Sequence, residues 1–405
     1  MKPLNILVNP ISNWIYSPPS HVQDLSEQLA VQNNVYGIYY YLPTGKNSPY
    51  TIPKKVKLIK LPLQPRVTNT ALQRFLNAIC YLMSLSNICR NLDVDVIINE
   101  DIFSAMALKY VPKRILKIFD FSDYFPDSTL IYIRNKHMIP IVSLCTWSLI
   151  LENIRTSQVC ISPSQALLNI SRKHGCKNTF FFPNSVDLKE YKFSQESRIH
   201  VRKLFAFSED DFILAHVGVI EPWIDFNLIF EGMHKTINSE INLKLLIIGS
   251  SITDYDKRIK REVKEYGLQN NVFFTGYVKR KDIPVYLSSA DAGIIAYVKG
   301  QFNSNVRLPV KFFQYSAIGL PILSTPLDEI TVLKPNHVLF FQDADSFKKA
   351  ISFLTSNKHL HNIYRSSATS FMKKYDLNIL SRKFNEYLRQ RARDQVRLRK
   401  EQAKA

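Results

Sequence analysis

Two basic side chains four residues apart, Arg307 and Lys311, could bind a phosphate group. They flank the start of a short helix that we predict over residues 309–318, because proline suits the first helical position and Gly319 can end a helix in a left-handed conformation. A helix N-terminus presents free N–H groups and a partial positive charge. We therefore predict an anion site here. The alternative is a surface helix with two solvated cations.

Three glycines that follow predicted strands belong to the same region. Buried strands are expected at residues 212–217, 243–248 and 272–275, and the glycines after them are Gly218, Gly249 and Gly276. In an open parallel sheet, ligands bind beyond the carboxyl ends of the strands, where glycine allows a close backbone approach. We expect these glycines to line the anion site. Simple turn glycines are the alternative.

A second polar group lies in the first half of the chain. Asp120 and Asp123 follow a buried strand expected at residues 115–119. We predict that Asp123, and after it Asp120, face a ligand, although helix capping and a solvated turn would also explain them. Asn13, Trp14 and His21, in or just after the first loop, could reach the same edge. A lone histidine is more often structural than functional.

The elements that must position these residues alternate between strands and helices. This alternation predicts parallel sheets covered by helices, and it is interrupted at residues 183–187 before it restarts. We predict an α/β fold with two Rossmann-like domains. The expected boundaries are residues 1–183 and 184–375, followed by a C-terminal helix and basic tail at 376–405 that packs back toward the first domain.

Composition limits the classes of protein to which the chain can belong. The sequence has 405 residues, of which 46% are hydrophobic, so most of it is expected to fold into compact domains. Its formal charge of +19 points to an anionic partner. The five cysteines show neither disulfide nor metal-ligand spacing, and a signal peptide is not expected. The most apolar window, residues 139–151, falls short of the roughly 20 residues of a spanning helix and is expected to form a buried helix.

Several motifs, in order along residues 159–325, resemble those of GT-B glycosyltransferases of the family-4 type. They are Cys160-Ile161-Ser162-Pro163-Ser164, Phe182-Pro183-Asn184-Ser185-Val186-Asp187, Ala215-His216-Val217-Gly218, Leu246-Ile247-Ile248-Gly249, Phe274-Thr275-Gly276-Tyr277-Val278, Leu287-Ser288-Ser289-Ala290-Asp291 and the segment from Pro309 to Pro321. Each motif is weak evidence by itself, whereas the ordered set is specific. The resemblance implies a GT-B fold, in which two Rossmann-like domains face each other across a cleft, the first binding the acceptor and the second the nucleotide-sugar.

The resemblance also implies roles for individual residues. Lys311 and Arg307 would neutralise the donor diphosphate, Asp123 and Asp120 would lie near the reacting sugar, and Asn13, Trp14 and His21 would contact the acceptor. The remaining nucleotide-sugar contacts would be Gly218, Gly249, Tyr277, Val278, Asn303, Ser304, Asn305, Val306 and Gln314. Val306 and Gln314 stand where this family normally has two glutamates. An amide at Gln314 can still bind ribose hydroxyls.

The resulting expectation is transfer of a sugar from a UDP- or GDP-sugar to a glycan or lipid-linked acceptor with retention of configuration. We expect no cofactor, no metal and no nucleic acid, and a cytoplasmic protein that can contact an anionic membrane through its basic tail. The loss of both glutamates keeps an alternative open, in which the chain is a non-catalytic binding or scaffolding subunit.

Overall fold

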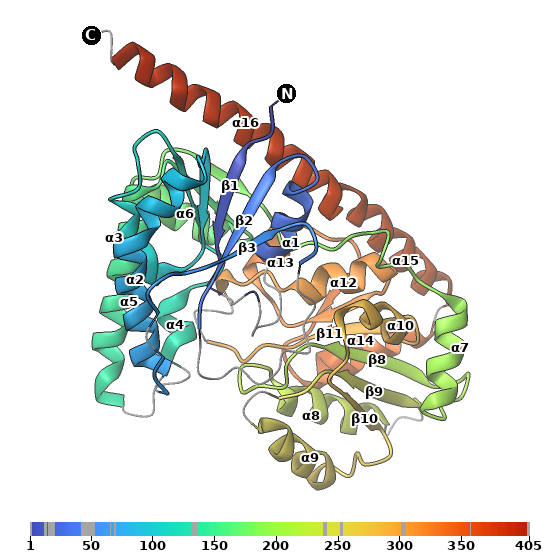
Figure 1. Ribbon diagram of the computed structural model, residues 1–405. Coiled ribbons are helices and arrows are strands. Elements are labelled where there is room, and N and C mark those ends of the chain that lie inside the picture. The colour runs from blue at the N-terminus through green and yellow to red at the C-terminus, as the bar shows by residue number, and fades with distance from the viewer. Residues whose placement is uncertain are drawn as a thin grey trace. The chain divides into compact units, whose positions relative to one another are not determined.

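The computed structural model describes residues 2–11, 14, 21–41, 53–64, 66–68, 70–130, 136–237, 241–251, 254–300, 305–356 and 358–402. The chain forms two compact units, which are Met1–Pro183 together with Asn378–Ala405, and Asn184–Leu377 (Figure 1). Each unit contains one parallel sheet, with helices between most of the consecutive strands. The expected α/β fold with two Rossmann-like domains is confirmed.

The first unit contains a seven-stranded sheet in the order β3-β2-β1-β4-β5-β6-β7, and all neighbouring strands are parallel. Its strands are β1 (Asn5–Asn9), β2 (Asn34–Tyr39), β3 (Lys57–Lys60), β4 (Val96–Asn99), β5 (Leu116–Asp120), β6 (Val159–Ser162) and β7 (Thr179–Phe181). Its helices are α1 (His21–Leu29), α2 (Thr70–Asn91), α3 (Ala105–Leu108), α4 (Phe125–Leu130), α5 (Ile139–Thr156) and α6 (Gln165–Lys173), with the short helices η1 (Ile102–Ser104) and η2 (Lys136–Met138). The apolar run of β4 is wholly buried, as a central strand of a parallel sheet requires.

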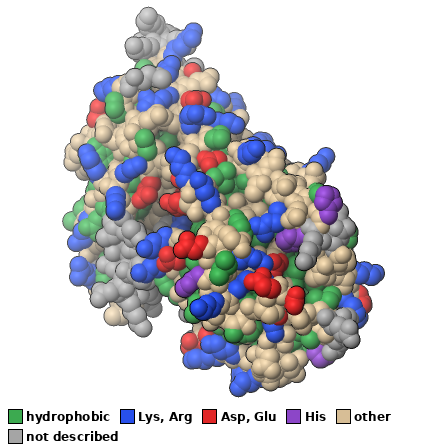
Figure 2. Space-filling view, turned by 90° about the vertical axis from the view of Figure 1, so that its right-hand side faces the viewer, with side chains coloured by type: hydrophobic (Ala, Val, Ile, Leu, Met, Phe, Trp, Pro, Cys, Tyr) green, Lys and Arg blue, Asp and Glu red, His purple; other side chains and the backbone are tan. Residues whose placement is uncertain are grey.

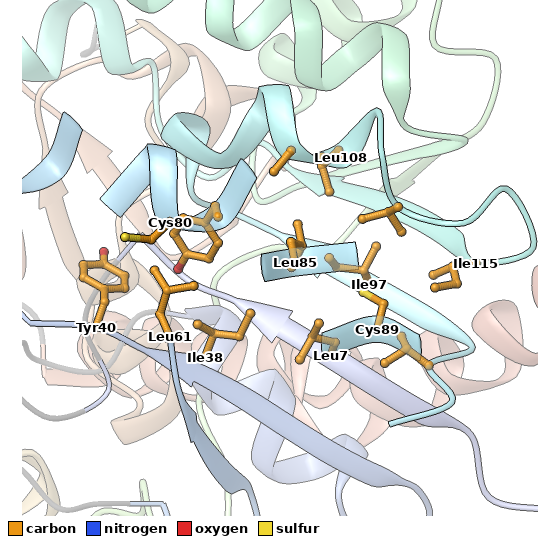
Figure 3. Packing of buried hydrophobic residues seen from close by; sticks show 14 residues of the cluster. Leu7, Ile38, Tyr40, Leu61, Cys80, Leu85, Cys89, Ile97, Leu108 and Ile115 are labelled. Atoms are coloured by element: carbon orange, nitrogen blue, oxygen red, sulfur yellow. The ribbon is translucent and has the colours of Figure 1, made fainter. Parts of the chain in front are cut away.

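Helix α2 covers one face of this sheet. Its inner side chains Cys80, Leu85 and Cys89 join a buried cluster with side chains of the strands, among them Leu7 and Ile97 (Figure 3). This apolar contact fixes α2 against the strands whose carboxyl ends carry the polar residues of interest.

The second unit contains a six-stranded parallel sheet in the order β10-β9-β8-β11-β12-β13. Its strands are β8 (Phe212–Val217), β9 (Leu243–Ile248), β10 (Val272–Gly276), β11 (Ala292–Ile295), β12 (Ile322–Ser324) and β13 (Val338–Phe340). Its helices are α7 (Gln195–Leu204), α8 (Phe226–Ile237), α9 (Tyr255–Glu265), α10 (Ile283–Leu287), α12 (Val310–Ile318), α13 (Asp328–Val332), α14 (Ala344–Ser356) and α15 (Lys358–Met372), with the short helices η3 (Arg280–Asp282) and η4 (Lys373–Tyr375).

Helix α16 (Leu377–Gln402) returns the chain to the first unit. Phe384 packs against Phe180 and Phe182, with ring centroids 5.1 and 5.7 Å apart. Arg389 donates hydrogen bonds to the backbone oxygen of Lys2 and to Asn33 Oδ1, at 3.0 and 2.8 Å. The C-terminal helix is therefore an integral part of the first unit.

One expectation about burial is wrong. Helix α5 was expected to be buried, but Ile141 and Leu144 are 55% and 67% exposed, and Cys145 is exposed as well. Only one side of α5 packs inward, because helical periodicity places these residues on the opposite side from Ile150 and Ile154. Among the described residues, no helix is both long and apolar enough to cross a membrane.

Candidate functional site

The predicted anion site lies at the point where the strand order of the second sheet reverses. This reversal falls between β8 and β11, and in such sheets ligands bind beyond the carboxyl ends of these strands. Gly218 follows β8, and Tyr297 lies two residues beyond β11. Lys311 of α12 reaches both, because its Nζ lies 3.7 Å from the position that a Cβ of Gly218 would occupy and 5.9 Å from the ring centroid of Tyr297.

Lys311 is a buried cation, with 8% of the residue exposed. Burial, and after it the charge of Arg307, lowers the pKa of its ammonium group to about 7. Within the part of the second unit that the structure describes, no carboxylate forms an ion pair with Lys311. Burying an unpaired charge is unfavourable, so the site favours an anionic ligand that supplies the missing counter-charge.

Arg307 adds a second cation to this site. Its Cζ lies 5.6 Å from the same Tyr297 ring centroid. The helix that carries Lys311 begins after Pro309, which has an extended backbone and makes no side-chain capping bond, and ends at Gly319 with a φ of 80°. The expected helix and its left-handed end are confirmed, although Pro309 precedes the helix and does not occupy its first position. The structure thus combines two cations and a helix N-terminus at one sheet edge.

Three strand-end turns meet beside these cations. Gly218 N–H donates a hydrogen bond of 2.9 Å to the carbonyl oxygen of Ile248, and Gly249 forms an isolated bridge with Gly276. A Cβ on Gly249 would lie 2.0 Å from the carbonyl oxygen of Gly218, and the φ of Gly249 is 145°. Only glycine fits at this position, because the turns approach each other so closely.

The two residues that replace the family's glutamates are both buried. Val306 is 5% exposed, and Gln314 is 8% exposed. Gln314 Nε2 donates a hydrogen bond of 2.8 Å to the hydroxyl of Tyr191. The amide oxygen of Gln314 remains able to accept a bond, so its predicted contact with ribose stays a prediction.

The structure describes three of the other five predicted donor contacts. Tyr277 and Val278 directly follow the carboxyl end of β10, and Tyr277 is half-exposed. Asn305 lies exposed, just before Val306. Asn303 and Ser304 lie outside the described residues. The predicted contacts of all five residues with the donor stay predictions.

In the first unit, three ionisable side chains converge at the carboxyl edge of the sheet, near its own reversal between β1 and β4. Asp120 ends β5, Glu100 follows β4, and His21 begins α1. His21 Nε2 lies 3.0 Å from Asp120 Oδ2, and one nitrogen or oxygen atom from each residue lies within 4.8 Å of the others. We call these three residues the acidic cluster.

The charges in the acidic cluster depend on one another. Burial alone would lower the pKa of His21, but the charge and hydrogen bond of Asp120 outweigh this effect and raise it to about 9. Burial, and after it the charge of Asp120, raises the pKa of Glu100. At neutral pH the cluster therefore holds an imidazolium ion beside Asp120. Its residue types also suit a divalent cation, although His21 would first have to lose its proton.

A buried polar network supports the sheet edge beside this cluster. Asn9 Nδ2 donates to Asn99 Oδ1 at 2.8 Å, and Asn99 Nδ2 donates to Asn153 Oδ1 at 2.9 Å. Tyr81 donates its hydroxyl proton to Asn9 Oδ1. These bonds link β1, β4, α2 and α5, so they fix the strand ends that carry Glu100.

Asp123, Trp14 and Asn13 are the remaining predicted residues of the first unit. Asp123 Oδ1 accepts a hydrogen bond of 2.9 Å from Tyr124 N–H, as expected of a turn residue. Trp14 is buried, and its indole occupies the space that a Cβ of Gly37 would need. Asn13 lies outside the described residues. The predicted roles of Asp123, Trp14 and Asn13 in acceptor binding stay predictions.

Glu100 was missed by the sequence analysis. The signal was present, since Glu100 and Asp101 directly follow a buried strand, as Asp120 does at its own strand end. The sequence alone did not show that β4 and β5 are neighbours or that α1 begins beside them.

Comparisons with known proteins bear on the second unit most directly. Residues 197–371 match the family described as Glycosyl transferases group 1. The chain is also 24% identical, over 180 residues, to TuaH of Bacillus subtilis (strain 168), a protein assigned as a teichuronic acid biosynthesis glycosyltransferase. That match covers 43% of this chain and 42% of TuaH, so the chain spans less than half the length of this curated relative.

Solved structures resemble the whole chain. Anabaena HepE in complex with UDP and glucose has a TM-score of 0.72 at 14% identity, covering 96% of this chain and 100% of that one. Sucrose-phosphate synthase from Thermosynechococcus elongatus has a TM-score of 0.74 at 14% identity, covering 96% and 99%. WaaG, a glycosyltransferase involved in lipopolysaccharide biosynthesis, has a TM-score of 0.68 at 13% identity, covering 94% and 99%.

These matches confirm the resemblance inferred from the motifs of residues 159–325. At such low identity the structural matches establish the fold, and the family match concerns the second unit. Residues 197–371 therefore match the group 1 glycosyl transferase family, within a chain whose two Rossmann-like domains have the fold of GT-B glycosyltransferases.

Proposed function

We propose that this protein transfers a sugar from a UDP- or GDP-sugar to a hydroxyl group of a glycan or lipid-linked acceptor, with retention of configuration. The observation that carries the proposal is the buried Lys311 ammonium group, which faces a strand-end turn at the sheet reversal. The family match and the UDP and UDP-glucose complexes of HepE support a nucleotide-sugar donor.

The proposed chemistry relies on positioning and electrostatics. As the bond between the anomeric carbon and the diphosphate oxygen breaks, negative charge grows on the leaving phosphate, and Lys311 and Arg307 stabilise it. The acceptor oxygen forms its bond to the anomeric carbon on the same face of the sugar. The departing phosphate takes the acceptor proton, and Asp120 and Asp123 orient the acceptor. We expect no cofactor and no metal, so a chelator such as EDTA should leave the rate unchanged.

A panel of UDP- and GDP-sugars tests the proposal. The full chain should release UDP or GDP from one donor in the presence of a glycan acceptor, and NMR of the product should show the anomeric configuration of the donor. Lys311→Ala should lower kcat/KM by about 100-fold or more, whereas Lys281→Ala, which removes an exposed lysine of the same unit, should leave it unchanged. Absence of both turnover and nucleotide binding would refute the proposal.

The second candidate is a non-catalytic binding or scaffolding subunit. It is favoured by Val306 and Gln314, because neither residue carries the carboxylate that the family normally has there. Isothermal titration with UDP and GDP separates the two candidates. Nucleotide binding without turnover of any donor would favour this second candidate.

We further propose that the reaction belongs to the synthesis of a cell-surface polysaccharide or glycoconjugate and takes place in the cytoplasm, at the inner face of the membrane. The formal charge of +19 supports attraction to anionic lipids. Fractionation of cells that express the full chain would test this location. The protein should be recovered with the membranes and should be released from them as the salt concentration is raised.

A further inference from the structure

The outer face of α2 is apolar and exposed. Its inner face packs on the sheet through Cys80, Leu85 and Cys89 (Figure 3). The opposite face carries five large exposed side chains, which are Leu72, Phe75, Ile79, Leu82 and Met83. Phe75 and Met83 are 62% and 63% exposed. A helix that is apolar on both faces is normally covered on both, so this outer face is suited to an apolar contact.

Two neighbouring elements extend this apolar surface. Helix α3 contacts both α2 and α5, and it carries the exposed side chain of Met106, with exposed Tyr110 two residues after its end. Met138, just before α5, and Ile141 and Leu144 in its first turns add further exposed side chains, spaced about one helical turn apart. We call the combined surface of these five residues and the five of α2 the α2/α5 face.

The charges around the α2/α5 face are almost all positive. Helices α2, α3 and α5 and the two residues after α3 carry three exposed basic side chains, which are Arg90, Lys109 and Arg155. A fourth, Arg74, lies near Asp101 and Tyr40 on the side of α2 that faces the sheet. The same segments carry one acidic residue, Glu152, which forms an ion pair of 3.1 Å with Lys109. The surface therefore combines exposed apolar groups with an excess of cations.

The whole first unit shares this imbalance. Residues 1–183 and 378–405 contain 28 Lys and Arg against 13 Asp and Glu, a formal charge of +15, whereas residues 184–377 contain 25 against 21, a charge of +4. Figure 2 shows another side of the molecule, on which both basic and acidic side chains are exposed. A binding partner of the first unit is therefore expected to be anionic.

We propose that the α2/α5 face is a docking surface for an anionic lipid bilayer. The exposed apolar side chains would enter the boundary between headgroups and acyl chains, and the basic side chains would attract the anionic headgroups. A second copy of the chain fits less well, because two units that each carry +15 would repel one another across the contact. This inference rests on the membrane location proposed above, for which it names the binding surface, and it does not depend on the proposed catalytic activity.

Vesicle flotation of the full chain tests the surface without donor or acceptor. The protein should bind phosphatidylcholine vesicles that contain about 30% phosphatidylglycerol, bind pure phosphatidylcholine vesicles at least about tenfold more weakly, and dissociate as salt is raised. Phe75→Ser with Met83→Ser should weaken binding to the anionic vesicles about tenfold, and so should Ile141→Ser with Leu144→Ser.

The matched control is Ile199→Ser with Leu204→Ser on α7 of the second unit, where the two side chains are 57% and 60% exposed. This control should bind vesicles as the parent does. Circular dichroism should show that all variants stay folded, since the changed side chains are exposed.

Three results would overturn the proposal. The first is absence of vesicle binding, and the second is equal binding by the α2/α5 variants and the parent. The third is a lipid-free dimer in sedimentation velocity that the α2/α5 variants dissociate, because the face would then bind a second copy. An inactive protein that still binds anionic vesicles through this face would refute the proposed function and leave the docking surface standing.

Discussion

At the scale of single residues, Lys311 links ligand binding to stability. Its ammonium group is buried beside Gly218 and Arg307, so folding favours the neutral form and lowers its pKa to about 7. An anion bound at the same place would favour the charged form and raise this pKa again. The cost of burying the cation is therefore expected in the free protein and relieved in the complex.

Lys311→Met should stabilise the free protein while it weakens nucleotide binding. Between the folded pKa of about 7 and the ordinary value of 10.5, the unfolded parent binds more protons than the folded one, so the parent gains stability as pH rises. The variant lacks this dependence and should be more stable by about 3 kcal/mol near pH 7, with a smaller gain toward pH 10. Urea unfolding at several pH values measures the difference. A variant that is less stable at pH 7 would contradict this account.

Asp120→Asn should lower the pKa of His21 and remove the stability that the ion pair contributes. In the parent, the His21–Asp120 pair stabilises the fold fully below pH 6.5, and this contribution is lost as pH rises through about 9. Without the carboxylate, burial is opposed only by the smaller effects of Glu100 and Asp24, so the pKa of His21 should fall from about 9 and the variant should lose the stabilisation that the parent has at neutral and acidic pH. We expect a loss of about 3 kcal/mol near neutral pH. NMR titration of the imidazole and urea unfolding measure both effects.

The control for this experiment is Asp24→Asn. Asp24 lies on α1 and makes a smaller contribution to the raised pKa of His21 than Asp120 does. The Asp24→Asn variant should therefore lower the pKa of His21 only slightly. An unchanged titration in Asp120→Asn would show that the ion pair does not hold the proton on His21.

At the scale of elements, the site depends on how closely the strand-end turns approach one another. Gly249→Ala would place a Cβ 2.0 Å from the carbonyl oxygen of Gly218, at a φ of 145°. We expect a loss of about 3 kcal/mol in stability and weaker UDP binding, because the turn beside Lys311 must shift. The control is Gly267→Ala, which also has a positive φ of 68° but open space around it. That variant should lose about 1 kcal/mol and keep its affinity for UDP.

Helix α16 depends on Arg389 for its attachment to the first unit. Arg389→Ala would leave Asn33 Oδ1 and the backbone oxygen of Lys2 without this donor, and we expect a loss of about 2 kcal/mol. Arg382→Ala, on an exposed part of the same helix, should change stability by less than about 0.5 kcal/mol. Urea unfolding followed by circular dichroism compares the two. Equal effects would show that charge on the helix matters more than these hydrogen bonds.

At the scale of the whole molecule, the proposed tasks are divided between two chemically different units. The second unit carries the group 1 glycosyl transferase match and the two cations, whereas the first unit carries the acidic cluster and most of the net charge. UDP should therefore slow hydrogen exchange at residues 215–220, 247–251 and 305–314. Exchange at residues 96–101 and 116–121 of the first unit should stay unchanged. Mass spectrometry of the full chain measures both, and protection confined to the first unit would contradict the proposed division.

Much of the fold could be predicted from the sequence, because the determining signals are local. The apolar run of residues 243–248 predicts a strand with the same bounds as β9. Gly319 predicts the end of a helix, and α12 ends there in the structure. The sequence missed β13 and α7, whose segments have weaker patterns. It also misjudged α5, because an apolar helix can expose one side when its neighbours cover only the other.

By itself, the sequence determined the alternation of elements, the strand-end glycines and the basic start of α12. Hydrogen-bond geometry and local propensity act over a few residues, so these features can be read from neighbouring positions. Only the tertiary structure decided that Lys311 loses contact with solvent beside Gly218, and that Glu100, Asp120 and His21 meet at one edge. Strand order sets these distances, and it follows from packing between residues far apart in the chain.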